Sequence, residues 1–355
     1  MKVVIFGATG NVGTSLLRSL ASEDAVDSVV GVARRRPAVE MPKVQWETAD
    51  VARSDLVPLV EGADAVVHLA WAIQPSRDLD ALRATNVTGS RRVFEAVERA
   101  GVPALVYASS VGSYSPGPKD RKVSEDWPTN GIATSFYSRH KAEVERLLDD
   151  LESRAPALRV VRLRKAIILK ADAASGIRRL FLGPFVPTTL ARPGLIPALP
   201  YVKGLRTQFV HSHDVGEAYR LALVKEVRGA FNVAAEPVLD LKTIARLLDA
   251  RPVRVPRILA RGAADLTWRL HLQPSPVGWF DMAVQTPLLD ATRAHEELGW
   301  TPRFTSAEAL LDFLDGLRRR AGLPTPPLDR RTGGPFRIRE ILGGVGAREM
   351  VRPTA

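Results

Sequence analysis

Apolar positions along the first half of the chain follow two alternating patterns. Short runs of apolar, often β-branched residues predict buried strands at residues 2–6, 28–33, 63–70, 104–110 and 158–164. Between them, apolar residues recur at three- and four-residue spacing, which predicts amphipathic helices over residues 11–22, 79–101 and 134–154. Strands that alternate with helices of this length form βαβ units. We therefore expect an α/β fold, a Rossmann-type doubly wound parallel sheet with helices on both faces.

The turn after the first predicted strand is rich in glycine. It reads "GATGNVG", with Gly7, Gly10 and Gly13 spaced three apart, and it opens the first predicted helix. Glycines at these positions permit a tight turn, a close approach of the backbone to a pyrophosphate and tight packing of the helix on the sheet. This position in the chain predicts dinucleotide binding.

The end of the second predicted strand bears on which dinucleotide is bound. An acidic side chain there would accept hydrogen bonds from the adenosine ribose, as in NAD sites, but this chain has Arg34 and Arg35. Guanidinium groups match a 2′-phosphate, so we expect NADP in preference to NAD. The alternative is a solvated arginine run with NAD still used. Asp50, after a further predicted strand, either binds the adenine amino group or caps a helix.

Tyr137 and Lys141 are four positions apart in "YSRHK" and would share one face of the last predicted helix. A nearby ammonium favours the phenolate, so we expect Lys141 to lower the pKa of Tyr137 and to suit it for acid and base catalysis. The alternative is that the two residues have this spacing by chance, on a solvated helix without a catalytic role.

Composition narrows the classes of protein. The 355 residues include no cysteine, which excludes disulfides and thiol nucleophiles and fits a cytoplasmic location. The chain has no apolar run of about 18 residues, so we expect no membrane span. The net charge is +11, but nine arginines against three acidic residues lie from Arg318 onward, in a stretch rich in Gly and Pro. Without a folded recognition motif nearby, we expect a surface tail and no nucleic-acid partner.

The six histidines are the next candidates for catalytic or metal-binding chemistry. We expect His68, in a strand, to be buried and structural, and His140 to be exposed. His211 and His213 lack a clear third ligand, so we expect no metal site. His295 falls in a segment considered below.

Several motifs together resemble the extended short-chain dehydrogenase/reductases, the NAD-dependent epimerase/dehydratase family. These are "GATGNVG" (7–13), "HLA" (68–70), "NVTGSRRVFEA" (86–96), "VYASSVGSY" (106–114) and "YSRHK" (137–141). Later segments, "FVHSHDV" (209–215), "GAFNVAAEP" (229–237) and "ATRAHEELGWTPR" (291–303), are similar to landmarks of the same family, so the resemblance spans about residues 1–322.

The resemblance implies roles for particular residues. Tyr137 would be the acid or base, Lys141 would bind the nicotinamide ribose, and Ser110 would orient the substrate oxygen, with Ser109 as the neighbouring candidate. A strand-end or capping hydroxyl is the alternative for either serine. The implied cofactor contacts are Gly7, Thr9, Gly10, Asn11, Val12, Gly13, Arg34, Arg35, Asp50, Val51, Leu69, Ala70, Trp71, Asn86, Ala108, Ser109, Tyr137, Lys141 and Lys165.

Lys165 marks a departure from the family pattern. The family often carries a proline-containing segment after this strand, whereas this chain reads "RLRKAII". Lys165 could reach the nicotinamide carboxamide, bind an anionic substrate or point to solvent.

The same resemblance implies a division of the chain. We expect a Rossmann domain from residues 1–164 and about 205–235, a smaller substrate-binding lobe from 165–204 and 236–322, and a basic Gly/Pro-rich tail over 323–355. The helices in 78–100 and 134–154 resemble the family's dimer interface, which implies a homodimer.

Three functions stay open at this point. The first is an NAD(P)-dependent oxidoreductase that acts at a carbinol or carbonyl carbon of a small molecule. The second is a nucleotide-sugar epimerase or dehydratase with tightly held NAD. The third is a non-catalytic dinucleotide-sensing protein, which the set of Ser110, Tyr137 and Lys141 disfavours.

Overall fold

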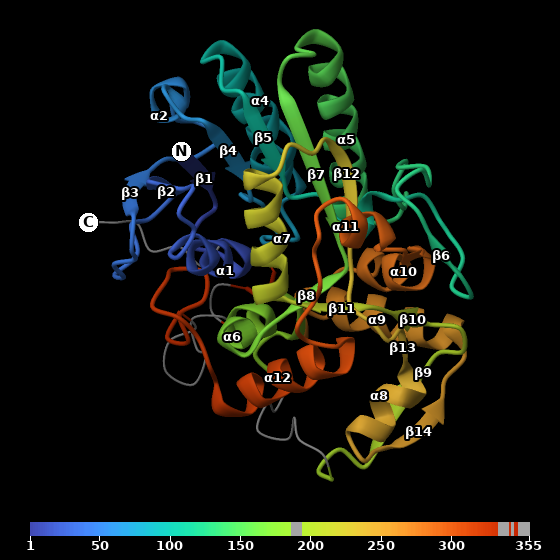
Figure 1. The fold of residues 1–355 in the computed structure, drawn as a ribbon. Helices are drawn as coiled ribbons and strands as arrows, with labels where there is room; N and C mark the ends of the chain where they lie inside the picture. The colour runs from blue at the N-terminus through green and yellow to red at the C-terminus, as the bar shows by residue number, and fades with distance from the viewer. Residues whose placement is uncertain (186–193, 333–340, 342–343, 347–355) are drawn as a thin grey trace.

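A parallel sheet forms the centre of the protein (Figure 1). The computed structural model describes residues 1–185, 194–332, 341 and 344–346. Within these ranges seven strands are joined, in the spatial order β12 (Gly229–Val233), β7 (Arg159–Lys165), β5 (Ala104–Tyr107), β4 (Ala65–His68), β1 (Lys2–Phe6), β2 (Ser28–Ala33) and β3 (Val44–Thr48). The chain runs outward from β1 to β3 and then returns to β4 on the other side of β1, so a crevice opens at the carboxyl ends of β1 and β4.

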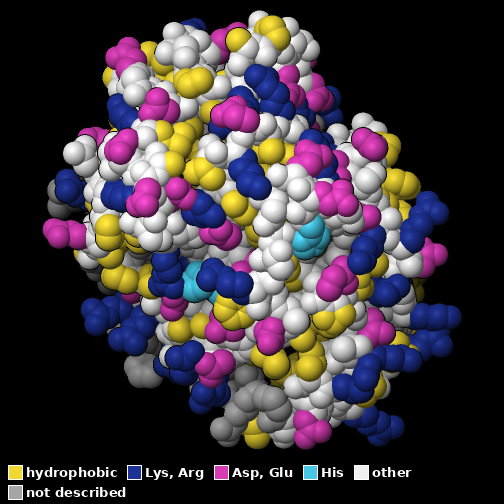
Figure 2. Space-filling view, in the orientation of Figure 1, with side chains coloured by type: hydrophobic (Ala, Val, Ile, Leu, Met, Phe, Trp, Pro, Cys, Tyr) yellow, Lys and Arg dark blue, Asp and Glu magenta, His cyan; other side chains and the backbone are white. Residues whose placement is uncertain are grey.

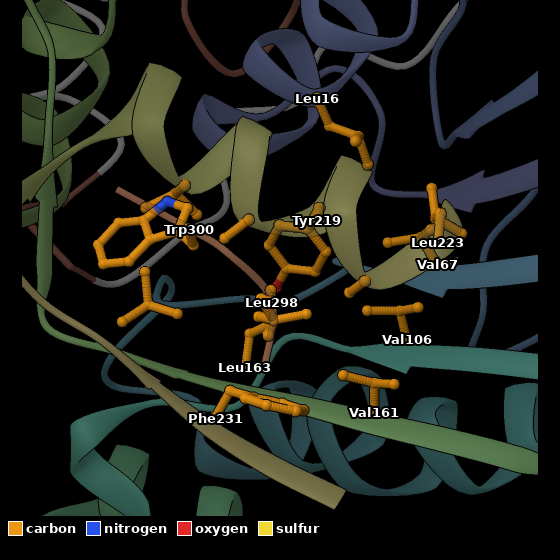
Figure 3. Packing of buried hydrophobic residues seen from close by; sticks show 14 of the residues in the cluster. Leu16, Val67, Val106, Val161, Leu163, Tyr219, Leu223, Phe231, Leu298 and Trp300 are labelled. Atoms are coloured by element: carbon orange, nitrogen blue, oxygen red, sulfur yellow. The ribbon is translucent and has the colours of Figure 1, made fainter. Parts of the chain in front are cut away.

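The first face of the sheet is covered by α1 (Asn11–Leu20) and α7 (Ser212–Val224). Figure 3 shows Leu16 of α1 and Tyr219 of α7 above the buried strand residues Val106 and Val161. Full burial of an aliphatic side chain of this size contributes roughly 1.5–3 kcal/mol, so this layer fixes α1, and with it the glycine-rich turn, against the strands.

The second face is covered by α4 (Gly89–Arg99) and α5 (Phe136–Arg154), with the short α2 (Val57–Val60) beside them. Phe94 of α4 and Leu148 of α5 are buried in this layer together with Tyr107 of β5. The helix predicted over 79–101 is interrupted: α3 (Leu79–Arg83) runs through a π-helical turn at Ala84–Thr88 into α4. Both faces of every central strand are therefore buried, as the apolar runs predicted.

A smaller lobe lies beyond the carboxyl ends of the strands, at the lower edge of Figure 1. Its core includes Leu169, Phe209, Leu310 and Phe313. The remaining elements of the described chain are β6 (Lys122–Val123), β8 (Ile167–Leu169), α6 (Ala174–Ile177), β9 (Ala198–Tyr201), β10 (Arg206–Thr207), β11 (Phe209–His211), β13 (Leu239–Asp240), α8 (Leu241–Leu247), β14 (Arg251–Arg254), α9 (Arg257–Arg269), α10 (Gly278–Gln285), β15 (Leu288–Leu289), α11 (Thr292–Glu296) and α12 (Ser306–Arg319).

These observations confirm the predicted doubly wound α/β fold. The exact domain boundaries stay a prediction. The expected tail over 323–355 falls partly outside the described residues, but residues 323–332 are packed against the protein, with the side chains of Thr325 and Leu328 buried. In the described ranges, no helix combines the length and the apolar character that a membrane crossing requires.

Candidate active site

The glycine-rich turn connects β1 to α1 and leaves no room for a side chain at Gly7 or Gly13. Gly7 has φ +84°, and a Cβ atom there would lie 2.7 Å from the backbone nitrogen of Ala70. A Cβ atom at Gly13 would clash with the carbonyl oxygen of Ala8. Gly10 caps α1, whose first amides point out of the helix toward the turn. The backbone therefore forms the cradle that a pyrophosphate requires.

A cleft opens next to this turn. Its lining comes from the ends of β1, β2 and β4 and from a segment near the C-terminus: Phe6, Gly7, Thr9, Gly10, Val32, Ala33, Arg34, Arg35, Ala49, Val51, Leu69, Ala70, Trp71, Thr85, Pro326 and Pro327. Nine of these were expected from the sequence to contact the cofactor. Phe6, Val32 and Ala33 were not, although their positions at the ends of predicted strands could have indicated them. Pro326 and Pro327 had no sequence signal.

Two predicted cofactor residues instead hold the backbone around the cleft. The carboxylate of Asp50 accepts a hydrogen bond from the amide of Ala52 (3.0 Å) within a turn, and no helix begins there, so the helix-capping alternative is wrong and the contact with adenine stays a prediction. The side chain of Asn86 is buried and makes hydrogen bonds to both the amide (2.7 Å) and the carbonyl (2.8 Å) of Ala72. Asn86 thereby fixes the loop that carries Trp71.

Other predicted residues lie at the interface of α1 with the second lobe and do not line the cleft. The side-chain amide of Asn11 donates to the carbonyl of Ile168 (3.4 Å). The carbonyl of Asn11 accepts from the buried Lys170 ammonium group (3.0 Å), whose pKa burial lowers to about 7. Val12, next to Asn11, packs against the core of the first face.

Ser109 and Lys165 point into the interior. The Ser109 hydroxyl donates to the carboxylate of Glu145, away from the cleft. The Lys165 ammonium donates to the hydroxyl of Tyr219 (2.8 Å) and to the carbonyl of Leu163 (3.2 Å). Lys165 is buried, and burial lowers its pKa to about 7. Of the three alternatives left open for Lys165, the structure excludes the one in which its side chain points to solvent.

Tyr137 lies near the start of α5, which begins where the Ser135 hydroxyl accepts a hydrogen bond from the amide of Ser138. Aromatic rings surround it: the centroid of Trp279 is 4.8 Å and that of Trp71 is 5.8 Å from the Tyr137 ring. Gly112 faces its edge, where a Cβ atom would lie 2.9 Å from Cε1 of Tyr137. Tyr137 thus connects the cleft, through Trp71, to α10 of the second lobe.

The pKa of Tyr137 is raised, whereas the sequence predicted a lowered one. Burial raises the pKa of Tyr137 to about 12, and a hydrogen bond with the side chain of Ser110 acts in the opposite direction. The Lys141 ammonium lies 5.9 Å from the centroid of the Tyr137 ring and does not lower this pKa. Burial of Tyr137, which sequence spacing could not reveal, therefore raises its pKa where the sequence had predicted a lower one.

Lys141 is buried one turn further along α5. It donates to the carbonyl of Ala108 (2.6 Å) and to the hydroxyl of Tyr107 (3.2 Å). Its ammonium lies 3.4 Å from the centroid of the Trp71 ring. Burial, followed by the charge of Lys165, lowers the pKa of Lys141 well below its usual range. The amine is thus positioned at the carboxyl end of β5, next to a residue that lines the cleft.

Ser110 caps a short turn, as one alternative predicted, and also forms a hydrogen bond with Tyr137. Its hydroxyl accepts a hydrogen bond from the amide of Gly112 (3.0 Å), which caps a short helical turn, and it also bonds to Tyr137. The structure thus brings together Ser110, Tyr137 and Lys141, with the backbone of Ala108 beside them.

The histidines do not join this site. His68 is buried as expected, with Nε2 2.9 Å from the Ser90 hydroxyl, and burial lowers its pKa to about 3. His140 is buried against Phe136, so its expected exposure is wrong. Among the described residues no cluster of three potential metal ligands occurs.

Comparisons with known proteins agree with this geometry. The profile of the NAD dependent epimerase/dehydratase family matches residues 3–234. An uncharacterized protein of Mycobacterium tuberculosis is 26% identical over 351 residues, which cover 96% of this chain and 88% of that protein. A putative dihydroflavonol 4-reductase of Synechocystis is 26% identical over 335 residues, covering 87% and 92%.

A solved structure shares the fold. It is a UDP-glucose-4-epimerase from Stenotrophomonas maltophila with bound NAD and formylated UDP-arabinopyranose, which matches with a TM-score of 0.68 over 90% of this chain and 98% of the other. The two sequences are 21% identical, so the likeness supports the fold alone.

Proposed function

The chain belongs to the NAD dependent epimerase/dehydratase family and is an NAD(P)-dependent enzyme; from this premise we propose that it is an NADP-dependent reductase of a small carbonyl compound. The observation that carries the proposal is the juxtaposition of the Ser110–Tyr137 pair with a dinucleotide cleft that Arg34 and Arg35 line. The Ser110–Tyr137 pair supplies a proton donor for a carbonyl oxygen. Arg34 and Arg35 supply cations for a phosphorylated ribose.

The residues of the cleft fit a dinucleotide. The glycine turn is a cradle that a Cβ atom would fill, and the amino end of α1 favours an anion beside it. When bound, the cofactor supplies or accepts a hydride. Lys141, beside Trp71 and the carbonyl of Ala108, is placed to bind its ribose hydroxyls.

The chain's own chemistry is proton transfer at a substrate oxygen. In the reductive direction the Tyr137 hydroxyl donates its proton to the oxygen of the carbonyl group as the carbon is reduced, and Ser110 holds the same oxygen by a hydrogen bond. Because burial keeps the pKa of Tyr137 high, the phenol is protonated at neutral pH. The site is thus prepared for the reductive direction.

The choice of NADP rests on the end of β2. Arg34 and Arg35 both line the cleft there, and none of the described residues that line it is acidic. A guanidinium pair matches the geometry and the charge of a 2′-phosphate, whereas NAD sites place a carboxylate at this position.

The substrate class follows from the surroundings of Tyr137. On the side of the second lobe, Trp279 contacts Tyr137, Phe181 lies 4.8 Å from Trp279 between ring centroids, and Met282 lies against Gly112. Such walls favour an apolar or aromatic carbonyl compound. The similarity to a putative dihydroflavonol 4-reductase supports this class.

A nucleotide-sugar epimerase or dehydratase with tightly held NAD is the second candidate. Membership of the epimerase/dehydratase family supports it. A non-catalytic dinucleotide sensor is disfavoured because it would not need Ser110 hydrogen-bonded to Tyr137. We further propose a cytoplasmic homodimer that associates through α4 and α5, as the family resemblance implies.

The experiment is a calorimetric titration of the purified protein with NADPH and, separately, with NADH, after the cofactor released from a denatured sample has been identified. Preferential NADPH binding with nothing retained, followed by NADPH oxidation in the presence of aromatic ketones or aldehydes, is the expected result. Retained NAD with no response to either reduced cofactor would instead support the epimerase or dehydratase. Binding of neither cofactor to a cofactor-free sample would contradict the proposal.

A further inference from the structure

The C-terminal segment reaches the dinucleotide cleft from far along the sequence. Residues 325–329 form a helical turn in which the carbonyl of Thr325 accepts hydrogen bonds from the amides of Leu328 (3.0 Å) and Asp329 (2.9 Å). The rings of Pro326 and Pro327 line the same cleft as Gly7, Thr9, Gly10, Arg34 and Arg35.

A direct bond ties this turn to the glycine-rich loop. The hydroxyl of Thr325 donates to the carbonyl of Thr9 (2.9 Å), and the side chain of Thr325 is 2% exposed. This contact joins residues 316 positions apart in the sequence. The segment is therefore seated on the loop that would cradle the pyrophosphate.

The second lobe holds the other side of the turn. Arg179 donates to the carbonyl of Pro327 (2.6 Å), and Leu328 is buried. Gly176 in α6 allows this approach, because a Cβ atom there would lie 2.9 Å from the Pro327 carbonyl oxygen. The turn is thus fixed between the two lobes, with its proline rings toward the cleft.

We propose that residues 325–328 are a built-in part of the dinucleotide site, which cover the adenosine diphosphate half of the cofactor and retain it. This rests on the proposed function, because it takes the cleft to be the cofactor site. The cleft has a free volume of about 170 Å³, which is less than the roughly 300–1,000 Å³ of typical ligand pockets. The turn narrows this cleft, and the Thr325–Thr9 bond and the contact of Arg179 with Pro327 oppose its movement away from the glycine-rich loop.

The chain offers a matched set of variants. Thr325→Val removes the hydroxyl that binds Thr9 and keeps the shape of the side chain. The double change Pro326→Ala and Pro327→Ala removes the two rings from the cleft. Pro324→Ala makes the same chemical change at an exposed position that does not line the cleft, so it controls for the loss of proline stiffness in the chain.

The measurement is the rate at which the full-length protein releases NADPH or NADH, whichever the wild type binds. Release is followed by the fluorescence of the reduced cofactor after mixing with an excess of the oxidised cofactor as competitor. We expect about a fivefold faster release from Thr325→Val, in line with the loss of one hydrogen bond, and at least as large a change from the double variant. Pro324→Ala should release the cofactor at the wild-type rate. Thermal melting verifies that each variant is folded.

Wild-type release rates in both folded cleft variants would overturn the inference and leave the proposed function intact. If either variant fails to fold, Gly176→Ala perturbs the seat of the turn from outside the cleft, and faster release from it is then required. A wild type that binds neither cofactor would instead remove the proposed function itself.

Discussion

The guanidinium group of Arg164 makes two parallel hydrogen bonds, each 3.0 Å long, to the carboxylate of Glu145. Both side chains are buried, and Arg164 comes from β7 whereas Glu145 comes from α5, one turn beyond Lys141. Arg162 adds a third bond at 3.0 Å to the same carboxylate. This buried ion pair fixes the helix that carries Tyr137 and Lys141 against the sheet.

We expect Glu145→Gln to destabilise the protein by about 3–5 kcal/mol, because it removes the carboxylate that pairs with the buried guanidinium group of Arg164, whereas Arg162 keeps its ion pairs with Asp149 and Glu152. Chemical denaturation measures the change in the free energy of unfolding. The matched control is Glu143→Gln on the same helix, whose partner Arg83 is half exposed, and about 1 kcal/mol or less is expected there. An equal loss of unfolding free energy in the two variants would contradict the prediction that the buried pair stabilises the protein more than the exposed pair does.

Acid should weaken the same contact. Burial by itself raises the pKa of Glu145, but Arg164 and Arg162 outweigh it and lower this pKa to about 2. The unfolded chain has an ordinary glutamate pKa near 4.5. The stabilisation is therefore complete above about pH 4.5 and is lost as the pH falls toward 2. Melting temperatures across this range should fall less steeply in Glu145→Gln than in the wild type.

Tyr137→Phe tests the proton donor. The change removes the phenolic proton but keeps the ring that packs on Trp279, so we expect cofactor affinity to stay within about twofold of wild type. Reduction of a carbonyl substrate should slow by about 10²–10⁴-fold, the usual contribution of a positioned acid. Steady-state kinetics with calorimetry on the same sample separate the two effects, and a variant that retains more than a tenth of the activity would exclude Tyr137 as the acid.

The high pKa of Tyr137 predicts an asymmetric pH dependence. Burial raises this pKa to about 12, partly opposed by the bond to Ser110, so the phenol is protonated throughout the range from pH 6 to 9. Carbonyl reduction needs the phenolic proton, so its rate should not fall over that range through deprotonation of Tyr137. Alcohol oxidation needs the phenolate, so its kcat/KM should rise by up to about tenfold per pH unit above neutrality. A profile for oxidation that is level from pH 7 to 9 would contradict this assignment.

Arg34 and Arg35 should set the cofactor preference. We expect the double change to Ala to weaken NADPH binding by about 10–100-fold, because each charge-assisted hydrogen bond contributes about 1.5–3 kcal/mol and part of it is lost to solvent. NADH binding should change little. Arg36→Ala is the control, since Arg36 is an exposed neighbour that does not line the cleft. A parallel loss for both cofactors would show that the arginines do not recognise the 2′-phosphate.

Figure 2 shows basic side chains interspersed with acidic ones over the face drawn there. The net charge of +11 therefore does not gather there into one continuous basic surface. The positive charges that matter for the proposed chemistry are the few that line the dinucleotide cleft.

The sequence by itself determined the parallel sheet and the glycine-rich turn after its first strand. The apolar run of residues 2–6, the glycines at 7, 10 and 13, and the helical spacing after them are local patterns, and the period of a strand or helix can be read without knowing what lies across from it. The same holds for Tyr137 and Lys141, whose four-residue spacing depends only on the helix.

The tertiary structure decided the directions of side chains and the contacts between distant segments. Lys165 turned out to bind Tyr219, and Ser109 turned toward Glu145, because each choice depends on which buried partner another element presents. The pKa of Tyr137 rose because rings from two lobes enclose it, which no spacing encodes. Likewise, Thr325 meets Thr9 only because the fold returns the end of the chain to its beginning.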